Sequence, residues 1–392
     1  AHEEFSKQCT CGLMSTATPI CNRPSDLVGQ LRSIGVNRTG TSGLCEAKNW
    51  HGPEGFGSVN PHIIRMFNAG AHRRDEGILN LPTITREVVR FNAQLSETNM
   101  GLYNKFLKDA IEILKRIIDQ RTGKIQVAEM LKLLACIHYM RTLIIHPLLL
   151  RTRSRDWSQQ DTDRCVLFPS AMMVTVLNVI ENLIADGHEQ ITVFGLRSNT
   201  VMPVLLQYIK EGISDNSWVG LYKGSCSQKA RASLIADFLS KPRPGQVKIL
   251  GIQMIAGGTG INLVPGPDAA VFIEQDWSPA NHRQALKRIH RIGQDKPVRL
   301  VNVVCNGSFD DAVQHVHTDK LSAADAIMNN KQLDHSMWRV HGSAVAMCQY
   351  MPCLEPVTPN PIALPTVAQP VVPPVAQPVA PPVAQPVAQP VA

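Results

Sequence analysis

The sequence predicts an α/β protein whose parallel sheet is covered by helices on both faces. From about residue 170, short apolar runs alternate with amphipathic stretches, which is the pattern of strands and crossover helices in a parallel sheet. Two longer helical stretches precede this region, and a proline-rich repeat follows it. With 392 residues, of which 44% are hydrophobic, the chain is long enough to bury a core and to form about two to three domains.

Two long helices are expected ahead of the alternating region. Residues 97–119 carry apolar side chains at the spacing of an amphipathic helix, among them Leu102, Phe106 and Leu114. A second helix, at about residues 125–144, should end at His146-Pro147, because proline cannot continue the backbone hydrogen-bond ladder. We expect these two helices to pack against each other.

The alternating region is expected to begin at about residue 171. Helices are predicted at residues 171–186, 201–211, 228–239 and 280–291. Strands are predicted at residues 191–194, 218–222, 247–252, 270–273 and 298–304. After about Pro352 the chain repeats Pro-Val-Ala-Gln and Pro-Pro-Val-Ala units, which favour polyproline II over a packed core. This tail is either a passive end or a stiff spacer that docks a partner.

The overall composition says little about partners. A formal net charge of +7 permits a polyanionic partner, but the positive residues are spread over many segments. The cysteines do not have the spacing of zinc ligands, so no metal site is expected. No run approaches the ~20 apolar residues that span a bilayer, so no membrane partner is expected.

A glycine-rich segment follows one of the predicted strands. Residues 256–263 are Ala-Gly-Gly-Thr-Gly-Ile-Asn-Leu. Glycines allow backbone amides to approach a phosphate closely, and Thr259 and Asn262 add short polar side chains. Such a loop suits a nucleotide or a nucleic-acid backbone, although a simple tight turn explains the glycines equally well.

A basic segment follows the glycine-rich one. Residues 284–294 are Gln-Ala-Leu-Lys-Arg-Ile-His-Arg-Ile-Gly-Gln. On a helix, Gln284, Arg288 and Arg291 are four and three residues apart and therefore share one face. Two arginine side chains on one face suit the charge of a phosphoryl group in transfer. The alternative is a basic helix whose charges face solvent.

These segments together resemble a known family. The loop at 256–263, the Asp276-Trp-Ser-Pro-Ala280 stretch and the Arg-Ile-His-Arg-Ile-Gly-Gln run are similar to helicase motifs V, Va and VI of the Swi/Snf family of DNA-dependent ATPases, in helicase superfamily two. The resemblance implies a RecA-like domain in which Arg288 and Arg291 are arginine fingers that reach ATP on another lobe. Two further residues would line the ATP cleft, namely Gln284 and Gly260. The residues that would contact the DNA backbone are Gly257, Gly258, Thr259 and Asn262.

The likeness extends toward the N-terminus. Ile191-Thr-Val-Phe-Gly195 is similar to motif IV, although the family usually has Ser or Thr where Gly195 stands. Residues 15–22, Ser-Thr-Ala-Thr-Pro-Ile-Cys-Asn, resemble motif III, with Ala17 where the family more often has Gly. This motif couples the nucleotide state to DNA contact. The coupling residues that the resemblance implies are Thr16, Thr18 and Asn22.

The resemblance implies a plan of four parts. Residues 1–95 would be the C-terminal remnant of a first RecA-like lobe with its linker, and residues 96–165 a helical insertion. Residues 166–335 would form the second RecA-like lobe, which carries motifs IV to VI, and residues 336–392 a low-complexity Pro/Val/Ala/Gln tail. The plan and the tail are also similar to global transactivator-like members of the family from large DNA viruses.

The phosphate-binding loop of such ATPases is not found in the sequence. No Gly-x-x-x-x-Gly-Lys-Ser/Thr occurs in the 392 residues, and Thr122-Gly-Lys-Ile125 lacks both the first glycine and the terminal hydroxyl. The resemblance therefore implies that ATP and Mg²⁺ are bound mainly by a P-loop-bearing lobe, acting in cis or in trans. On its own, this chain is not expected to hydrolyse ATP.

Two functions stay open at this point. In the first, the chain is part of an ATP-dependent double-stranded DNA translocase that remodels chromatin in the nucleus, or in the host nucleus if the protein is viral. In the second, it is a non-catalytic DNA- or chromatin-binding protein that keeps the helicase fold. A dinucleotide-binding enzyme does not fit, because residues 257–260 lack the Gly-x-Gly-x-x-Gly spacing and an acidic residue ~20 positions later.

Overall fold

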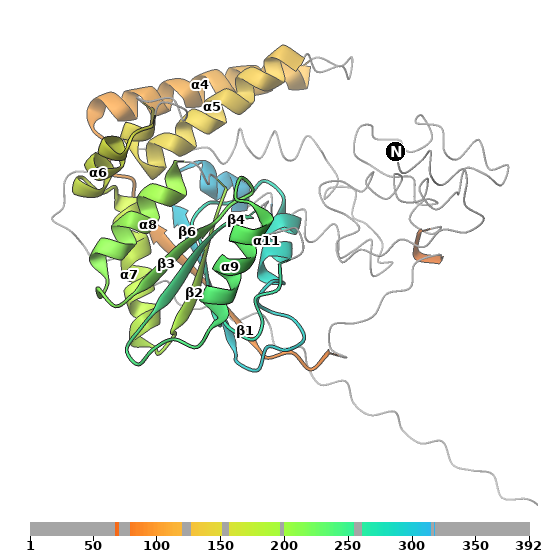
Figure 1. Cartoon of the computed structure of the whole chain (residues 1–392). Helices are drawn as coiled ribbons and strands as arrows, with labels where there is room; N and C mark the ends of the chain where they lie inside the picture. Colours follow the sequence, from red (N-terminus) through yellow and green to blue (C-terminus); the bar gives the residue numbers. More distant parts are fainter. Residues whose placement is uncertain are drawn as a thin grey trace, which may run out of the picture.

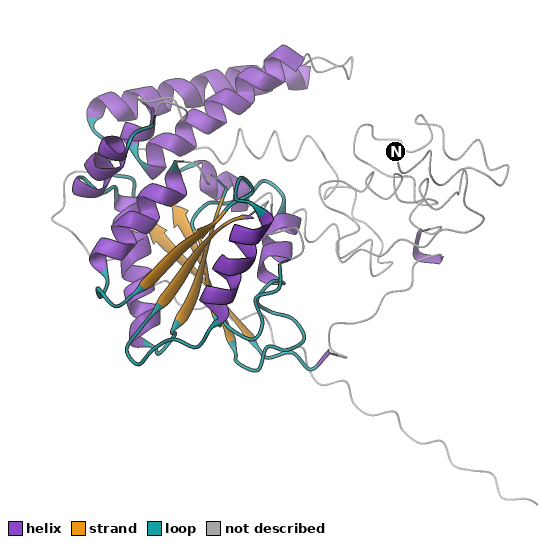
Figure 2. Cartoon of the chain, in the orientation of Figure 1, coloured by secondary structure: helices purple, strands orange, loops and turns teal. Residues whose placement is uncertain are grey.

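The computed structural model describes seven stretches of the chain. They are residues 67–69, 79–119, 127–150, 157–196, 200–254, 261–314 and 317. Within them the chain forms one sheet and a set of flanking helices (Figures 1 and 2). The expected motif III, with Thr16, Thr18 and Asn22, and the proline-rich tail lie outside the described residues.

All strands of the sheet run parallel, in the order β1-β6-β5-β2-β4-β3. The strands are β1 Ile84–Phe91, β2 Gln190–Gly195, β3 Trp218–Tyr222, β4 Lys248–Gln253, β5 Ala269–Phe272 and β6 Val298–Cys305. Each strand from β2 to β6 matches an expected strand to within one residue at either end. The predicted fold class, a RecA-like parallel sheet with helices on both faces, is confirmed.

Helices cover both faces of this sheet (Figure 2). The helices are α4 Glu97–Asp119, α5 Val127–Ile145, η4 Pro147–Leu150, α6 Gln159–Leu167, α7 Ala171–Ala185, α8 Val201–Gly212, α9 Gln228–Leu239 and α11 Pro279–Leu286. α7 and α8 lie on one face, and α9 and α11 lie on the other. Taken one at a time, none of the described helices is both long and apolar enough to cross a membrane, although α6 and α7 pass together as a pair bent by 75°.

Successive residues of the central strand β2 point to opposite faces and enter two separate cores. Ile191 and Val193 are buried in the core that contains α7 and α8, whereas Phe194 is buried in the core that contains α9 and α11. Burial on both faces explains why these strands are continuous apolar runs in the sequence. Gly251 in β4 permits close approach of α8, because a Cβ there would lie 2.6 Å from Cδ1 of Leu206.

The helical pair α4–α5 lies at one end of the sheet (Figure 1). Tyr103 and Leu107 of α4 and Met140 of α5 are each at most 1% exposed and belong to one core. α5 ends at Ile145, just before Pro147, as the proline rule predicts. Both expected helices are confirmed, and they pack together.

β1 is the main departure from the expected organisation. It lies before residue 95, in the stretch expected to hold the remnant of a first lobe and its linker, and it pairs with β6 along its whole length. Nε and Nη2 of Arg299 in β6 donate to the two carboxylate oxygens of Glu87 in β1, at 2.8 and 3.1 Å. The strand was not expected because its charged side chains, including Arg86 and Arg90, resemble a solvated segment. An edge strand accommodates such charges because only one of its sides is paired.

Candidate functional site

α11 carries the first residues of the candidate site, and a network around Asp276 holds the start of this helix. Oδ1 of Asp276 accepts a hydrogen bond from the backbone N of Ser278 at 2.7 Å, and Oδ2 accepts one from Nδ2 of Asn281 at 2.9 Å. The backbone N of Asp276 donates to Nε2 of His282 at 2.9 Å. Pro279 occupies the first turn, where its missing N–H costs nothing. Asp276 therefore defines the point where the chain leaves β5 and begins α11.

The helix predicted over residues 280–291 is wrong in its extent, because α11 ends at Leu286. The backbone N of Arg288 bonds at 3.0 Å to a carbonyl only three residues back, so the chain tightens into a turn after the helix. Arg288 and Arg291 consequently do not share a helical face with Gln284, which lies on α11 itself and is partly buried.

Residues 287–294, which we call the arginine turn, are anchored to the domain by buried contacts. Nε2 of Gln294 donates to the carbonyls of Pro267 and Ile289, at 2.9 and 3.0 Å. The side chain of Ile289 is fully buried in the core beneath α11. Gly293 has a φ of +101°, a conformation that L side chains rarely adopt. The turn therefore has a defined shape, and that shape requires its glycine.

The two arginine side chains of the turn differ in exposure. Arg288 is partly buried, whereas Arg291 is exposed. Burial of the guanidinium and the positive charge of Arg291 both lower the pKa of Arg288. Because arginine stays protonated at neutral pH, the two guanidinium groups of the turn are both positively charged and repel each other. An anion beside the pair, such as the phosphates of a nucleotide, relieves this repulsion.

The glycine-rich loop begins after β4, and most of it lies outside the described residues. The predicted site residues in that gap are Gly257, Gly258, Thr259 and Gly260. Asn262, which follows the gap, is exposed, and its Oδ1 accepts a hydrogen bond from the backbone N of Val264 at 3.4 Å. The backbone N of Leu263 donates to the carbonyl of Arg288 at 3.2 Å. The end of the loop and the arginine turn, which the sequence predicted separately, are thus bonded to each other.

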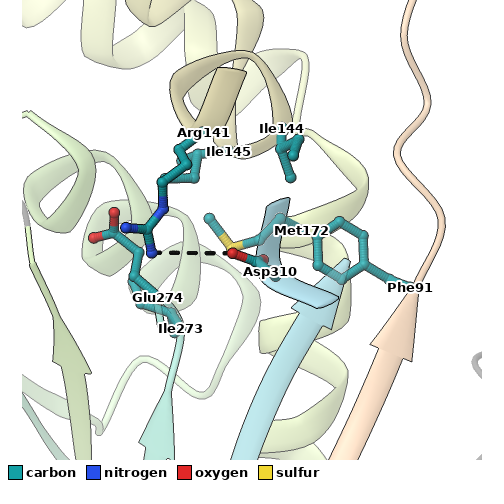
Figure 3. A pocket seen from close by; sticks show the side chains of 8 residues that line it. All are labelled: Phe91, Arg141, Ile144, Ile145, Met172, Ile273, Glu274 and Asp310. Atoms are coloured by element: carbon teal, nitrogen blue, oxygen red, sulfur yellow. Dashed lines mark ion pairs between the residues drawn. The ribbon is translucent and has the colours of Figure 1, made fainter. Parts of the chain in front are cut away.

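Three charged side chains that the sequence analysis did not select lie together beside the end of β5 (Figure 3). They are Arg141 of α5, Glu274 after β5 and Asp310 after β6, and all three line one small pocket. Oε2 of Glu274 accepts a hydrogen bond from the backbone N of Leu196 at 2.8 Å, which joins the end of β5 to the end of β2. No spacing rule selects these residues, because they come from segments far apart in the sequence.

His282 on α11 was also not selected. Its ring stacks on Phe272 with centroids 4.6 Å apart and meets His317 edge-on at 5.2 Å. Burial, followed by the positive charges of His317 and Arg141, lowers the pKa of His282 to about 3. The imidazole is therefore neutral at physiological pH, which allows Nε2 to accept the hydrogen bond from the backbone of Asp276.

The chain is similar to several curated proteins. It is 26% identical over 281 residues to the DNA repair and recombination protein RAD54-like of Gallus gallus, a match that covers 69% of this chain and 36% of that protein. It is 25% identical over 263 residues to the ISWI chromatin-remodeling complex ATPase ISW2 of Saccharomyces cerevisiae, covering 67% and 21%. It is 31% identical over 108 residues to the TATA-binding protein-associated factor MOT1 of the same yeast, covering 28% and 6%. The chain thus spans between 6% and 36% of the length of these relatives.

A comparison with protein families identifies the central part of the chain. Residues 175–293 match the helicase conserved C-terminal domain. They resemble this domain of Swi/Snf-type ATPases, and we call residues 175–293 the helicase C-terminal domain. This helicase C-terminal domain begins within α7 and ends at Gly293 of the arginine turn, so it contains α11 and both arginines. β1 and the helical pair α4–α5 lie outside the matched residues.

Two solved structures also resemble the helicase C-terminal domain and its flanks. One is the SWI2/SNF2 ATPase core of Sulfolobus solfataricus in complex with dsDNA, at 18% identity and a TM-score of 0.48, covering 83% of this chain and 63% of that one. The other is the C-terminal part of the Fun30 ATPase domain, at 18% identity and a TM-score of 0.46, covering 69% of this chain and 98% of that one.

Proposed function

We propose that the helicase C-terminal domain supplies arginine fingers and DNA-backbone contacts to an ATP-dependent double-stranded DNA translocase. Its partner in this proposal is a P-loop-bearing lobe, in cis or in trans. The arginine turn carries the proposal, since Arg288 and Arg291 are two neighbouring positive charges on a well-anchored turn. Arginine forks match the geometry of phosphate oxygens, and the pair would stabilise the charge that develops in phosphoryl transfer.

The side chains of the turn fit the phosphate end of ATP and not its metal ion. Both arginines are hydrogen-bond donors only, so they match phosphate oxygens but cannot bind a cation. Gln284 and Gly260 would line the same cleft. Within the part of the chain that the structure describes, no group of three or more His, Cys, Asp or Glu side chains is placed to hold a metal ion. The proposal therefore assigns Mg²⁺ and most of the ATP contacts to the P-loop lobe, and this chain alone should not hydrolyse ATP.

The glycine-rich loop would provide the DNA contacts. The residues proposed for this role are Gly257, Gly258, Thr259 and Asn262. The bond between the backbones of Leu263 and Arg288 supports a direct mechanical link from the DNA side to the ATP side of the domain. Contacts to phosphates position a protein without reading bases, so DNA binding should tolerate any sequence and weaken with salt. Further coupling is assigned to motif III, through Thr16, Thr18 and Asn22.

The names of two relatives refer to chromatin remodelling and to DNA repair, which supports DNA and chromatin as partners of this chain. ISW2 is named as a chromatin-remodeling complex ATPase, and the RAD54-like protein as a DNA repair and recombination protein. By extension, we assign this chain to the nucleus, or to a host nucleus if the protein is viral, with double-stranded DNA and chromatin as its partners.

The deciding experiment measures DNA-stimulated ATPase activity of the full 392-residue chain after addition of a purified P-loop lobe from a related Swi/Snf-type ATPase. The mixture should hydrolyse ATP in response to double-stranded DNA. Replacing either arginine, as Arg288→Ala or Arg291→Ala, should lower kcat by about 1,000-fold or more, because each removes charge stabilisation in the transition state.

The matched control for these variants is Lys296→Ala. It removes a positive charge just beyond the arginine turn, where the lysine side chain is 60% exposed. Equal activity of Arg288→Ala and Lys296→Ala would refute the arginine-finger assignment. DNA binding by the chain with no ATPase activity in the mixture would instead favour the second candidate function, a non-catalytic DNA- or chromatin-binding protein.

A further inference from the structure

Arg141 extends from α5 into the end of the sheet, where it contacts two other segments (Figure 3). Its Nη2 donates a hydrogen bond to the backbone carbonyl of Gln275, just after β5. A guanidinium nitrogen also lies 3.9 Å from a carboxylate oxygen of Asp310, after β6, and both side chains are only 12% exposed. The guanidinium lies 5.6 Å from the ring centroid of Phe309. One side chain of the helical pair therefore contacts the ends of two strands.

The carboxylate of Asp310 depends on this arginine. Burial raises the pKa of Asp310, while the charge of Arg141 and a hydrogen bond from the backbone N of Cys305 lower it. A buried carboxylate without a cation nearby is costly, so the two side chains need each other. Arg141 thus stabilises the segment after β6 through Asp310, as well as the segment after β5 through Gln275.

The segment that Arg141 contacts is also the point where several strand ends meet. Nε2 of Gln275 donates to the carbonyl of Val303 in β6 at 3.4 Å, and Oε1 of Gln275 accepts from Nε2 of Gln314 at 2.9 Å. Oε2 of Glu274 accepts a hydrogen bond from the backbone N of Leu196, just after β2. Residues 274–276 therefore connect three neighbouring strand ends, and Arg141 connects them to α5.

A short path leads from this segment to the arginine turn. Asp276 holds the start of α11 through Ser278, Asn281 and His282. The charge of Arg141 acts on His282 directly, since it contributes to the lowered pKa of that imidazole after burial and His317. α11 then runs into the arginine turn at its C-terminal end. A shift of residues 274–276 would displace the axis of α11 and the two arginines beyond it.

We propose that Arg141 is a positioning residue that aligns the arginine turn, by holding residues 274–276 and the start of α11 against the helical pair α4–α5. The structural part of this proposal stands alone, and only its effect on catalysis rests on the proposed function. Nη2 of Arg141 faces both the carbonyl of Gln275 and the carboxylate of Asp310, while the planar guanidinium lies near the ring of Phe309. A lysine keeps the charge but has a shorter side chain and no planar guanidinium, so it would hold these partners less well.

The first test is hydrogen exchange, followed by mass spectrometry, on the full chain without any partner. Arg141→Met should accelerate amide exchange in residues 274–291 by about tenfold or more, while exchange in β2 to β4 stays unchanged. Arg141→Lys retains a positive charge beside the buried Asp310, so it should fold more readily than Arg141→Met. It should show a smaller acceleration in the same residues. The matched control is Arg116→Met on α4, where the arginine is 60% exposed and lies 3.9 Å from Glu129. Unchanged exchange in residues 274–291, or equal acceleration throughout the sheet, would overturn the proposal.

The second test measures the catalytic consequence in the mixture with the P-loop lobe. Arg141→Lys should lower kcat by about 10- to 100-fold, because misplaced catalytic groups lose much of their effect. The KM for ATP and the affinity for DNA should stay the same. Because a loss of folded protein would also lower the apparent kcat without changing KM, kcat is calculated per folded molecule, with the folded fraction measured by urea unfolding. A wild-type mixture without ATPase activity would count against the proposed function, and the exchange experiment would still decide the role of Arg141.

Discussion

His282 illustrates how one side chain can tie folding to a single protonation state. Its pKa is about 3 in the folded chain and 6.5 for an unperturbed histidine. Between these values the unfolded chain binds a proton that the folded chain does not bind. The stability of the fold should therefore decrease as the pH falls from about 6.5 toward 3, by at most about 1.4 kcal/mol per pH unit from this group. Urea unfolding at about pH 7.5 and pH 5 measures the change.

A pair of variants isolates this contribution. His282→Gln removes the titrating group, so its stability should depend less on pH over that range than the stability of the wild type. His138→Gln, which replaces an exposed histidine on α5, is the matched control for the loss of one imidazole. The same pH dependence in wild type and His282→Gln would show that another group is responsible.

The candidate site residues were found in two different ways. Arg288, Arg291 and Asn262 were selected from the sequence because their segments have motifs with a specific spacing, and their roles stay predictions. Arg141 could not be predicted, since its hydrogen bond to Gln275 joins residues 134 positions apart. Only the fold brings such residues together, and the sequence alone contains no periodicity that relates them.

At the scale of elements, apolar patterning predicts the strands whose residues are apolar along their length. β2, β4, β5 and β6 were predicted because their residues enter cores on both sides of the sheet, and the partly buried edge strand β3 was predicted because it carries no charged residue. β1, the other edge strand, was missed because charged residues interrupt its apolar pattern. α11 was predicted too long because Ile289, beyond its end, continues the helical spacing although it is buried from a turn.

The arginine turn allows a direct test of its backbone shape through Gly293. At a φ of +101°, any L side chain is strained, and Gly293→Ala should lower the free energy of unfolding by about 1–2 kcal/mol. The cost is backbone strain alone, since a Cβ there would meet nothing closer than Cγ2 of Val264 at 3.7 Å. Urea unfolding measures this loss, and ATPase activity with the P-loop lobe should fall as well.

A glycine in ordinary helical surroundings serves as the control for Gly293. Gly101 lies within α4, and a Cβ there would meet nothing within 4 Å. Gly101→Ala should therefore stabilise the fold, by roughly 0.5–1 kcal/mol. If both variants change stability in the same direction, the strain assigned to Gly293 is not present.

At the scale of the whole molecule, the sheet extends beyond the residues that resemble a helicase domain. β6 has β5 on one side and β1 on the other, and its Val301, Val303 and Val304 are at most 1% exposed. A fragment of residues 96–317 lacks β1 and leaves this apolar strand as an open edge, which invites pairing between molecules. Such a fragment should self-associate, whereas residues 79–317 should stay monomeric, as measured by gel filtration with light scattering. A monomeric, equally stable shorter fragment would contradict this.

The pairing of β1 with β6 also has a consequence for the order of events during synthesis. Glu87 and its partner Arg299 are 212 residues apart, so a ribosome that adds about 5–20 residues per second releases them roughly 10–40 s apart. Throughout that interval the nascent β1 has no strand to join. Its arginines and glutamate keep this unpaired segment soluble, whereas a fully apolar strand would form non-native contacts with other apolar segments. The charges that interrupt the apolar pattern of β1 thus keep the nascent chain soluble until β6 has been synthesised.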